Sequence, residues 1–178
     1  MLLVLINSAS IAGENQTIRL QLKWHHQFQF AGYYAAIEKG FYDEVGLNVL
    51  INQGGGPYDP INAVFEDYAE FGVTDTDILT MVTERQNAII LAAIFQHSPQ
   101  VLVVSKTSGI NHVHDLIGKR IGLGYGATDI YTLLKNEGIG LDNCIIDSLP
   151  INLNRLIKGE LDAIASYSTN EPYILDTI

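Results

Sequence analysis

The sequence is poor in cysteine, in basic residues and in long apolar runs. Its 178 residues include one cysteine, Cys144, which excludes an internal disulfide, a zinc site of four cysteines and a paired redox motif. Ten Lys and Arg residues face 20 Asp and Glu residues, and a net charge of -10 argues against binding to nucleic acid or anionic lipid. No apolar run approaches the roughly 20 residues that a membrane-spanning helix needs. The 47% share of hydrophobic residues indicates a folded protein, with a length that suits one domain or two small lobes.

Motifs for metal binding and nucleophilic catalysis are also absent from the sequence. His25 and His26 are adjacent, so on a strand they point to opposite faces, and His112 and His114 are two residues apart. No HExxH motif or carboxylate triad accompanies them, and no GxSxG motif is present. Cys144 lies in an apolar segment, where a buried cysteine usually acts as a small hydrophobic residue. We therefore expect no catalytic residue, no metal ion and no cofactor.

Alternating strand and helix patterns follow one another along most of the chain. Residues 17–24 alternate between apolar and polar side chains, which predicts a strand, and Gly40 ends a helical pattern over residues 31–39. The run AIILAAIF at 88–95 is typical of a strand covered on both faces in a parallel sheet. Together these patterns predict βαβ units and a mostly parallel α/β fold. Further strands are predicted at 47–51, 70–73, 101–105, 120–123, 144–146 and 161–167, and further helices at 60–68, 74–85, 111–117, 128–136 and 153–158.

The two ends of the sequence also carry expectations. Residues 1–13 combine an apolar run with small residues, which resembles the second half of a secretory signal, although a buried first strand is the alternative. We expect an exported protein of a bacterial periplasm, where disulfides are permitted but not required. The pattern at 173–178 stops without a cap or polar tail, so we expect a truncated protein.

Three features suggest a ligand site at strand ends. Trp24 ends the first strand, where open α/β sheets bind ligands and where a flat indole would stack on a flat ring. The segment 122–127 fits G-x-G-x-x-A before a helix, a weak dinucleotide pattern that also suits an anion or a polar ligand atom. Glu171 follows an apolar strand and would hydrogen-bond an aminopyrimidine-like edge, unless it is a solvated loop residue.

The segment LQLKWHHQFQFAGYYAAIEKGFYDEVGLNV at 20–49 resembles the opening of bacterial substrate-binding proteins for thiamine pyrimidine precursors. That family is grouped with the nitrate, sulfonate and taurine binders and with the fungal thiamine-pyrimidine synthases. Further matching segments are AEFGVTD at 69–75, AAIFQHSP at 92–99, SGINHVHDLIGKRIGL at 108–123 and DAIASYSTNEPY at 162–173.

This resemblance implies a type II periplasmic-binding-protein fold that is incomplete at the C-terminus. Two α/β lobes with mostly parallel sheets, at 17–100 and 107–178, would be joined by a hinge strand at 101–106 and would close on a small ligand. The chain of such a protein normally returns to the first lobe, and that return would be missing here. The implied ligand-binding residues are Trp24, Phe30, Thr74, Asp75, Thr76, Gln96, Gly124, Tyr125, Gly126, Ala127, Thr128, Asn170 and Glu171.

The resemblance also implies partners and a role. The leading expectation is binding of a pyrimidine thiamine precursor for the membrane subunits of an ABC importer. Because QFQF and IFQHSP look most like segments of membrane sensors, the alternative is a sensory domain fused to a histidine kinase or diguanylate cyclase. A thiamine-pyrimidine synthase is a distant third, since the single Cys144 and Phe30 depart from the cysteine-rich motif and the histidine of the fungal enzymes.

Overall fold

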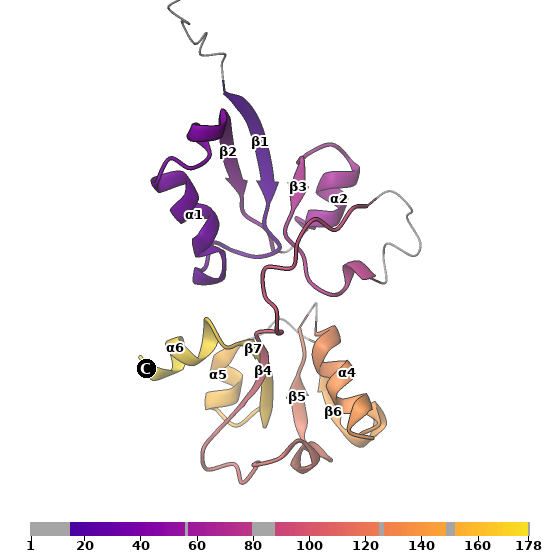
Figure 1. Ribbon diagram of the computed structural model, residues 1–178. Helices are drawn as coiled ribbons and strands as arrows, with labels where there is room; N and C mark the ends of the chain where they lie inside the picture. The colour runs from indigo at the N-terminus through magenta and orange to yellow at the C-terminus, as the bar shows by residue number, and fades with distance from the viewer. Residues whose placement is uncertain (1–14, 56, 80–87, 125–126, 149–151, 178) are drawn as a thin grey trace, which may run out of the picture. The chain divides into compact units, whose positions relative to one another are not determined.

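The computed structural model describes residues 15–55, 57–79, 88–124, 127–148 and 152–177 (Figure 1). Contacts group the chain into two compact units. Unit 1 comprises residues up to His26 and Phe30–Val73, whereas unit 2 comprises Gln27–Gln29 and the residues from Thr74 onward. Residues 74–106 thus group with the second unit. The expected signal segment at 1–13 lies outside the described residues.

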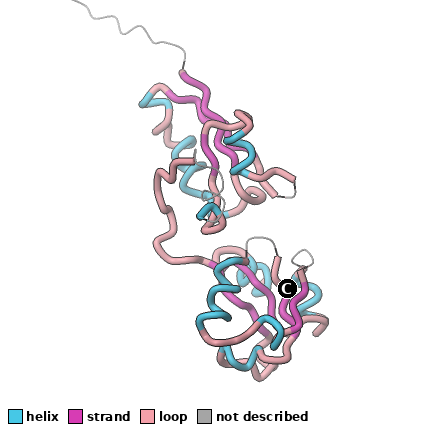
Figure 2. Tube along the Cα trace, turned by 90° about the vertical axis from the view of Figure 1, so that its right-hand side faces the viewer, coloured by secondary structure: helices cyan, strands magenta, loops and turns pink. Residues whose placement is uncertain are grey.

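Unit 1 is a three-stranded parallel sheet with two helices (Figures 1 and 2). The strand order is β2-β1-β3, so the chain moves from β1 to one side and then crosses to the other. Leu20 of β1 pairs with Phe71 of β3 in parallel register. The elements are β1 (Gln16–Gln21), α1 (Ala31–Glu38), β2 (Leu47–Asn52), α2 (Pro60–Phe65) and β3 (Phe71–Gly72), with a 3-10 turn at Asp43–Val45. A further 3-10 turn at Phe28–Phe30 begins in the short segment that groups with unit 2.

The core of unit 1 lies on one face of β1. The period of two places Leu20 and Leu22 on the same face, where both are buried together with Phe30. Tyr33 and Tyr34 of α1 pack against this cluster, so α1 covers that face. The start of α2 is fixed locally: the side chain of Asp59 accepts a hydrogen bond from the backbone N–H of Asn62 at 2.7 Å, and Pro60 occupies the first helical turn.

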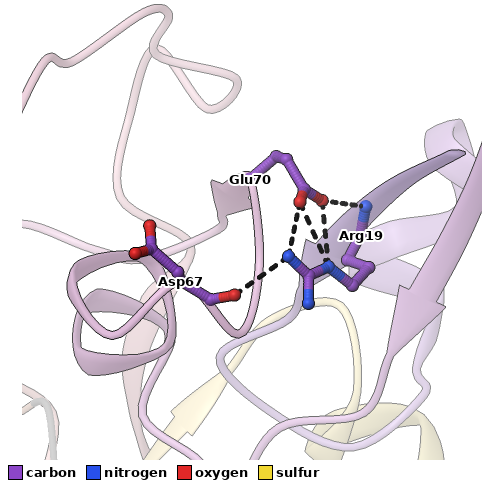
Figure 3. A network of polar contacts seen from close by, with 3 residues as sticks. All are labelled: Arg19, Asp67 and Glu70. Atoms are coloured by element: carbon purple, nitrogen blue, oxygen red, sulfur yellow. Dashed lines mark hydrogen bonds and ion pairs between the residues drawn. The ribbon is translucent and has the colours of Figure 1, made fainter. Parts of the chain in front are cut away.

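The opposite face of β1 carries an ion pair that ties the strand to the end of the α2–β3 connection (Figure 3). Arg19 donates from its backbone N–H to Glu70 Oε2 at 2.6 Å and from Nε to Oε1 at 3.1 Å. Its Nη2 also donates to the carbonyl oxygen of Asp67 at 2.9 Å. Asp67 has a φ of 58°, in the left-handed region that aspartate tolerates better than most residues. The pKa of Glu70 falls to about 2, chiefly because Arg19 hydrogen-bonds its carboxylate.

Unit 2 contains a four-stranded mixed sheet with the order β4-β7-β5-β6. β5 lies in parallel register with both β6 and β7, whereas β4 is antiparallel to β7. Its elements are β4 (Gln100–Val104), β5 (Arg120–Gly122), α4 (Thr128–Asn136), β6 (Ile145–Asp147), α5 (Leu153–Ile157), β7 (Ala163–Tyr167) and α6 (Glu171–Asp176), with 3-10 turns at Val113–Leu116 and Leu141–Asn143.

Both faces of the unit 2 sheet are covered by apolar side chains. On one face, Ala163 and Ala165 of β7 pack in a cluster with Ile130 and Leu134 of α4. On the other face, Ile164 packs with Leu156 of α5 and with Leu161. β7 is therefore a central strand that is buried on both sides.

The sequence patterns located most elements correctly. α4 has the predicted bounds, and the other predicted strands and helices that can be compared differ from the structure by a few residues at most, except for two regions. The predicted helix at 74–85 lies partly outside the described residues. The predicted strand at 88–95 is wrong, because these residues form no strand and expose Ile89 by 82% and Leu91 by 70%. Apolar character alone does not form a strand, since the backbone also needs a partner.

A further helix, α6, was not predicted, although Glu171-Pro172 is a typical first turn. Among the described residues, none of the helices combines the length and the apolar character that crossing a membrane requires.

Candidate functional site

The topology of each unit identifies a candidate site at the carboxyl ends of its parallel strands. In unit 1 the chain leaves β1 for β2 on one side and later reaches β3 on the other, so the carboxyl ends of β1 and β3 flank a switch point. Unit 2 repeats this arrangement with β5, β6 and β7. Open α/β sheets bind ligands outside the carboxyl ends of strands at such points. Trp24 follows β1, and Thr128 and Glu171 follow β5 and β7.

At the unit 1 edge, the segment after β1 stays paired with the segment after β2. Leu22 donates its backbone N–H to the carbonyl oxygen of Asn52 at 2.9 Å, and Gly54 donates to that of Trp24 at 3.0 Å. A Cβ atom at Gly54 would lie 1.9 Å from the carbonyl oxygen of Leu22, so only glycine permits this approach. The two strand extensions therefore form one tightly packed ledge that carries Trp24.

Trp24 is 39% exposed and lies beside His25. The two ring centroids are 5.2 Å apart and the planes are inclined at 62°, an edge-on arrangement. Gly55 is buried against both rings, because a Cβ there would lie 3.3 Å from His25 Cε1 and 3.6 Å from Trp24 Cε3. The exposed part of the indole remains accessible to a flat ligand, which fits the predicted stacking role of Trp24.

Two residues close to Trp24 in the sequence, His26 and Phe30, contact α1 and the unit 1 core. The imidazole Nδ1 of His26 hydrogen-bonds the hydroxyl of Tyr34, which anchors the segment after Trp24 to α1. Phe30, one of the expected ligand-binding residues, is only 3% exposed and packs in the unit 1 core with Leu20 and Leu22. Its observed contacts are those of a packing residue, and its contact with a ligand stays a prediction.

In unit 2, two Thr–Asp pairs exchange hydrogen bonds. Thr76 donates from Oγ1 to Asp129 Oδ1 at 2.8 Å, and Thr128 donates from its hydroxyl to the carboxylate of Asp77. Ser98 also donates to the carboxylate of Asp129. The structure thus brings together Thr76 and Thr128, which are distant in the sequence and were both expected at the site.

An open hollow of about 530 Å³ borders this network. Three polar members of the network were missed by the sequence reasoning: Asp77, Ser98 and Asp129. The repeated Thr-Asp dipeptide at 76–77 and 128–129, each beside a predicted helix start, is the signal that could have found the two aspartates. The residues that line the hollow are Thr76, Leu79, Ser98, Thr128, Asp129, Thr132, Leu133 and Asn136.

Glu171 is the first residue of α6, close to the carboxyl end of β7, and it is held by contacts with nearby residues of the chain. Its Oε2 accepts a hydrogen bond from the backbone N–H of Tyr167 at 2.7 Å, and its Oε1 accepts one from Asn170 Nδ2 at 2.8 Å. Asn170 and Glu171 are both only partly exposed, and their contact with a ligand stays a prediction. A carboxylate oxygen has capacity for a second donor, so these contacts leave acceptor sites for a ligand.

The remaining expected residues have varied positions. The side chain of Asp75 accepts from the backbone N–H of Asp77 at 3.1 Å and so shapes the turn beside Thr74. Gln96 donates to the carbonyl oxygen of Ala93 at 2.7 Å in an exposed segment. Ala127 is buried in the α4 core, and Gly124 is partly buried after β5. Tyr125 and Gly126 lie outside the described residues.

Groups that could bind a metal ion or act as a nucleophile can be examined among the described residues. Within those ranges no three His, Cys, Asp or Glu residues are close enough to hold a metal ion. Cys144 is buried in the unit 2 core, where its thiol donates to the carbonyl oxygen of Leu116 at 3.4 Å. Burial raises the pKa of this thiol, which lowers its reactivity as a nucleophile.

This arrangement of two α/β units with mostly parallel strands is the type II periplasmic-binding-protein fold, which solved structures of periplasmic binding proteins share with the chain. One is a periplasmic sulfonate-binding protein SsuA from Methylobacillus flagellatus KT, with a TM-score of 0.65 and 20% identity over 92% of this chain and 54% of that one. The chain belongs to the family described as NMT1/THI5 like, whose model matches residues 27–177.

The chain also matches two curated relatives, and it spans half or less of the length of each. A Haemophilus influenzae protein named "Putative thiamine biosynthesis protein" is 23% identical over 156 residues, which cover 84% of this chain. A 4-amino-5-hydroxymethyl-2-methylpyrimidine phosphate synthase from Legionella pneumophila is 27% identical over 107 residues, or 59% of this chain. The chain spans 49% of the first relative and 34% of the second.

Proposed function

We propose that this chain is the ligand-binding part of an exported, non-enzymatic protein that binds a small pyrimidine thiamine precursor. The observation that carries the proposal is the partly exposed indole of Trp24, held on a ledge at the switch point of the unit 1 sheet. An indole in this position offers a flat apolar face to an aromatic ring. Membership of the NMT1/THI5 like family and the names of the two curated relatives support a thiamine-related ligand.

The charges near the start of α4 favour a neutral or cationic ligand over a sulfonate. A helix N-terminus normally attracts an anion, because its backbone N–H groups and dipole carry partial positive charge. Here the carboxylates of Asp77 and Asp129 already lie beside Thr128 in the first turn. A sulfonate would meet these negative charges, whereas the amino group of an aminopyrimidine would find acceptors. Glu171 adds a further carboxylate in the same unit.

Calorimetry on the purified protein tests this ligand class. We expect heat of binding with 4-amino-5-hydroxymethyl-2-methylpyrimidine and none with an aliphatic sulfonate at the same concentration. Because the chain contains one tryptophan, ligand stacking should also change the emission of Trp24 directly. Clear heat with the sulfonate and none with the pyrimidine would refute the proposed ligand while leaving the fold assignment intact.

Replacing Trp24 by alanine should weaken pyrimidine binding. Trp24→Ala removes the stacked ring and its burial, which costs roughly 1–3 kcal/mol of binding free energy. Trp24→Phe retains a smaller aromatic face and should lose less, so it serves as the matched variant. Both are measured by calorimetry, because the substitutions remove the fluorescent group. Equal affinity of all three proteins would exclude Trp24 from the site.

The proposed partner is the membrane complex of an ABC importer. The matched solved structure from Methylobacillus is named as a transporter-associated periplasmic binding protein, which supports this role. A sensory domain fused to a signalling module is the alternative, and the reading frame beyond residue 178 in the genome separates the two. Turnover of the pyrimidine or of a pyridoxal-type cofactor, followed by absorbance, would instead support a synthase, in line with the name of the Legionella relative.

A further inference from the structure

Two residues, His25 and Gly55, lie beside Trp24 on the ledge formed by the segments after β1 and β2. The His25 ring lies edge-on to the indole at a centroid distance of 5.2 Å. Gly55 lies within van der Waals reach of both rings and adopts a φ of +93°, which L side chains rarely adopt. The indole is thus in contact with the His25 ring and lies beside the backbone of Gly55, and Trp24 remains 39% exposed.

We propose that Gly55 and His25 are positioning residues that set the orientation of the Trp24 indole for ligand stacking. The inference rests on the proposed function, in which Trp24 is the stacking group. Stacking depends on ring orientation, because aromatic pairs gain most from offset or edge-on arrangements at defined separations. A Cβ atom at position 55 would lie 3.3 and 3.4 Å from His25 Cε1 and Nε2, so the His25 ring would have to shift, and it would lie 3.6 Å from Trp24 Cε3. We expect a shift of the His25 ring to be passed to the indole that it contacts edge-on.

The ledge has a second anchor on its C-terminal side. His26, the residue after His25, hydrogen-bonds the hydroxyl of Tyr34 in α1. The rings of His26 and Tyr34 are 5.9 Å apart with an interplanar angle of 76°. The segment that carries Trp24 is therefore fixed on one side by Gly54 and Gly55 and on the other by α1. Each contact limits the freedom of the indole before a ligand arrives, which reduces the entropy lost on binding.

The first test uses the ligand-free protein, with the near-ultraviolet circular dichroism and acrylamide quenching of Trp24 as readouts. Gly55→Ala and His25→Ala are expected to change both signals, because each alters the surroundings of the only tryptophan. Gly32→Ala is the matched control, since a Cβ atom at Gly32 in α1 would meet nothing within 4 Å and the backbone there is not left-handed. It should retain the wild-type signals. Unchanged signals in His25→Ala and Gly55→Ala would overturn the inference.

The second test separates positioning from direct ligand contact. His25→Phe keeps a ring edge beside the indole but removes both nitrogens, so it should restore the wild-type Trp24 signals. With 4-amino-5-hydroxymethyl-2-methylpyrimidine as the probe, Gly55→Ala should bind roughly five- to a hundredfold more weakly, the range expected when a tight contact is overpacked. His25→Phe should bind within about threefold of the wild type, below half a decade in affinity. Full loss of binding in His25→Phe, despite normal Trp24 signals, would overturn a purely positional role.

The outcomes distinguish this inference from the proposed function. If wild-type protein binds no pyrimidine but the Trp24 signals still change in His25→Ala and recover in His25→Phe, the proposed ligand is wrong and the positioning inference stands. If the wild-type protein binds the pyrimidine and His25→Ala binds equally well with unchanged signals, the ligand is right and the inference is wrong. Because Gly55→Ala could impair folding through its backbone conformation, the two His25 variants keep the test decisive.

Discussion

The two units repeat one strand arrangement around the same Arg–carboxylate contact. In unit 1, Arg19 donates its backbone N–H to Glu70 at 2.6 Å, while Glu70 returns its own N–H to the Arg19 carbonyl oxygen at 3.1 Å. In unit 2, Arg120 and Asp162 make the same exchange at 2.8 Å in both directions. Each contact joins the first parallel strand to the strand that follows a helix, β1 to β3 and β5 to β7.

The resemblance extends to the turn after each helix. The guanidinium Nη2 of Arg19 binds the carbonyl oxygen of Asp67, and that of Arg120 binds the carbonyl oxygen of Gly159 at 2.8 Å. Both acceptor residues have positive φ, 58° for Asp67 and 69° for Gly159. Each lies three positions before the carboxylate residue of its unit. In each unit, one arginine of the first parallel strand therefore binds both the turn that follows the helix and the carboxylate just before the next strand.

The units differ in what covers the third parallel strand. β7 has β4 on its outer side and apolar clusters on both faces, whereas β3 has two residues and lies at the edge of its sheet. Phe71 of β3 is correspondingly 41% exposed. The Arg–carboxylate contact is thus shared by the two units, whereas the additional antiparallel strand covers the outer side of the third parallel strand only in unit 2. Substitutions in the two cores, at two strand glycines and at the two carboxylates test this difference.

Core truncation should have the largest effect on stability. Leu134→Ala in α4 and Leu22→Ala after β1 each remove a fully buried side chain, and each should lower the free energy of unfolding by about 2–5 kcal/mol. The cost at Leu134 should be the larger, because its cluster contains more buried residues than that of Leu22. Chemical denaturation measures both. Leu133→Ala, next to Leu134, and Leu50→Ala in β2 remove exposed side chains of the same two units, so they are the controls and should cost far less. The reverse order of the two core variants would contradict the comparison.

Replacing two strand glycines by alanine should have the second-largest effect on stability. A Cβ at Gly72 of β3 would lie 2.8 Å from the carbonyl oxygen of Pro60, which is backbone and cannot easily move. A Cβ at Gly122 of β5 would lie 2.8 Å from Leu161 Cδ1, the flexible end of a side chain. Overpacking costs about 1–3 kcal/mol, so Gly72→Ala should fall at the upper end and Gly122→Ala at the lower. Thermal melting measures both, and a larger loss in Gly122→Ala would refute the argument.

The Arg–carboxylate contacts should have the smallest effect at neutral pH and a visible effect in acid. The pKa of Glu70 falls from 4.5 to about 2, because Arg19 binds the ionised form. A depressed pKa stabilises the folded state above the unfolded value, so this contribution is complete above pH 4.5 and is lost as the pH falls toward 2. The pKa of Asp162 is also lowered, through its hydrogen bonds from Arg120.

Neutral substitutions at Glu70 and Asp162 should therefore reduce the stability that the protein loses as the pH falls. Glu70→Gln and Asp162→Asn are compared with the wild type by melting temperature along a series of decreasing pH. Each variant should lose less stability than the wild type below pH 4.5, the ordinary value for Glu70. Glu66→Gln, at an exposed residue beside α2, serves as the charge control. Parallel curves for Glu70→Gln and the wild type would show that the Arg19 contact does not persist in solution.

Local sequence signals predicted the elements well and the contacts poorly. The alternation before Trp24, the Asp59–Pro60 helix start and the bounds of α4 are all readable within a few residues. The Thr76–Asp129 contact joins residues 53 positions apart, and the repeated Thr-Asp dipeptide marks both segments without indicating that they meet. The site prediction accordingly contained Thr76 and Thr128 but not the two aspartates that accept from them.

The sequence by itself determined the alternation of strands and helices, the helix starts and the aromatic residue after β1, because these depend on side-chain periodicity and on hydrogen bonds within a few residues. Only the tertiary structure decided that β7 is a central strand, that residues 88–95 remain unpaired with any strand among the described residues, and that His25 and Gly55 enclose Trp24. Such contacts depend on which distant segments meet. An apolar run carries the tendency to be covered, but its partner is specified elsewhere in the chain.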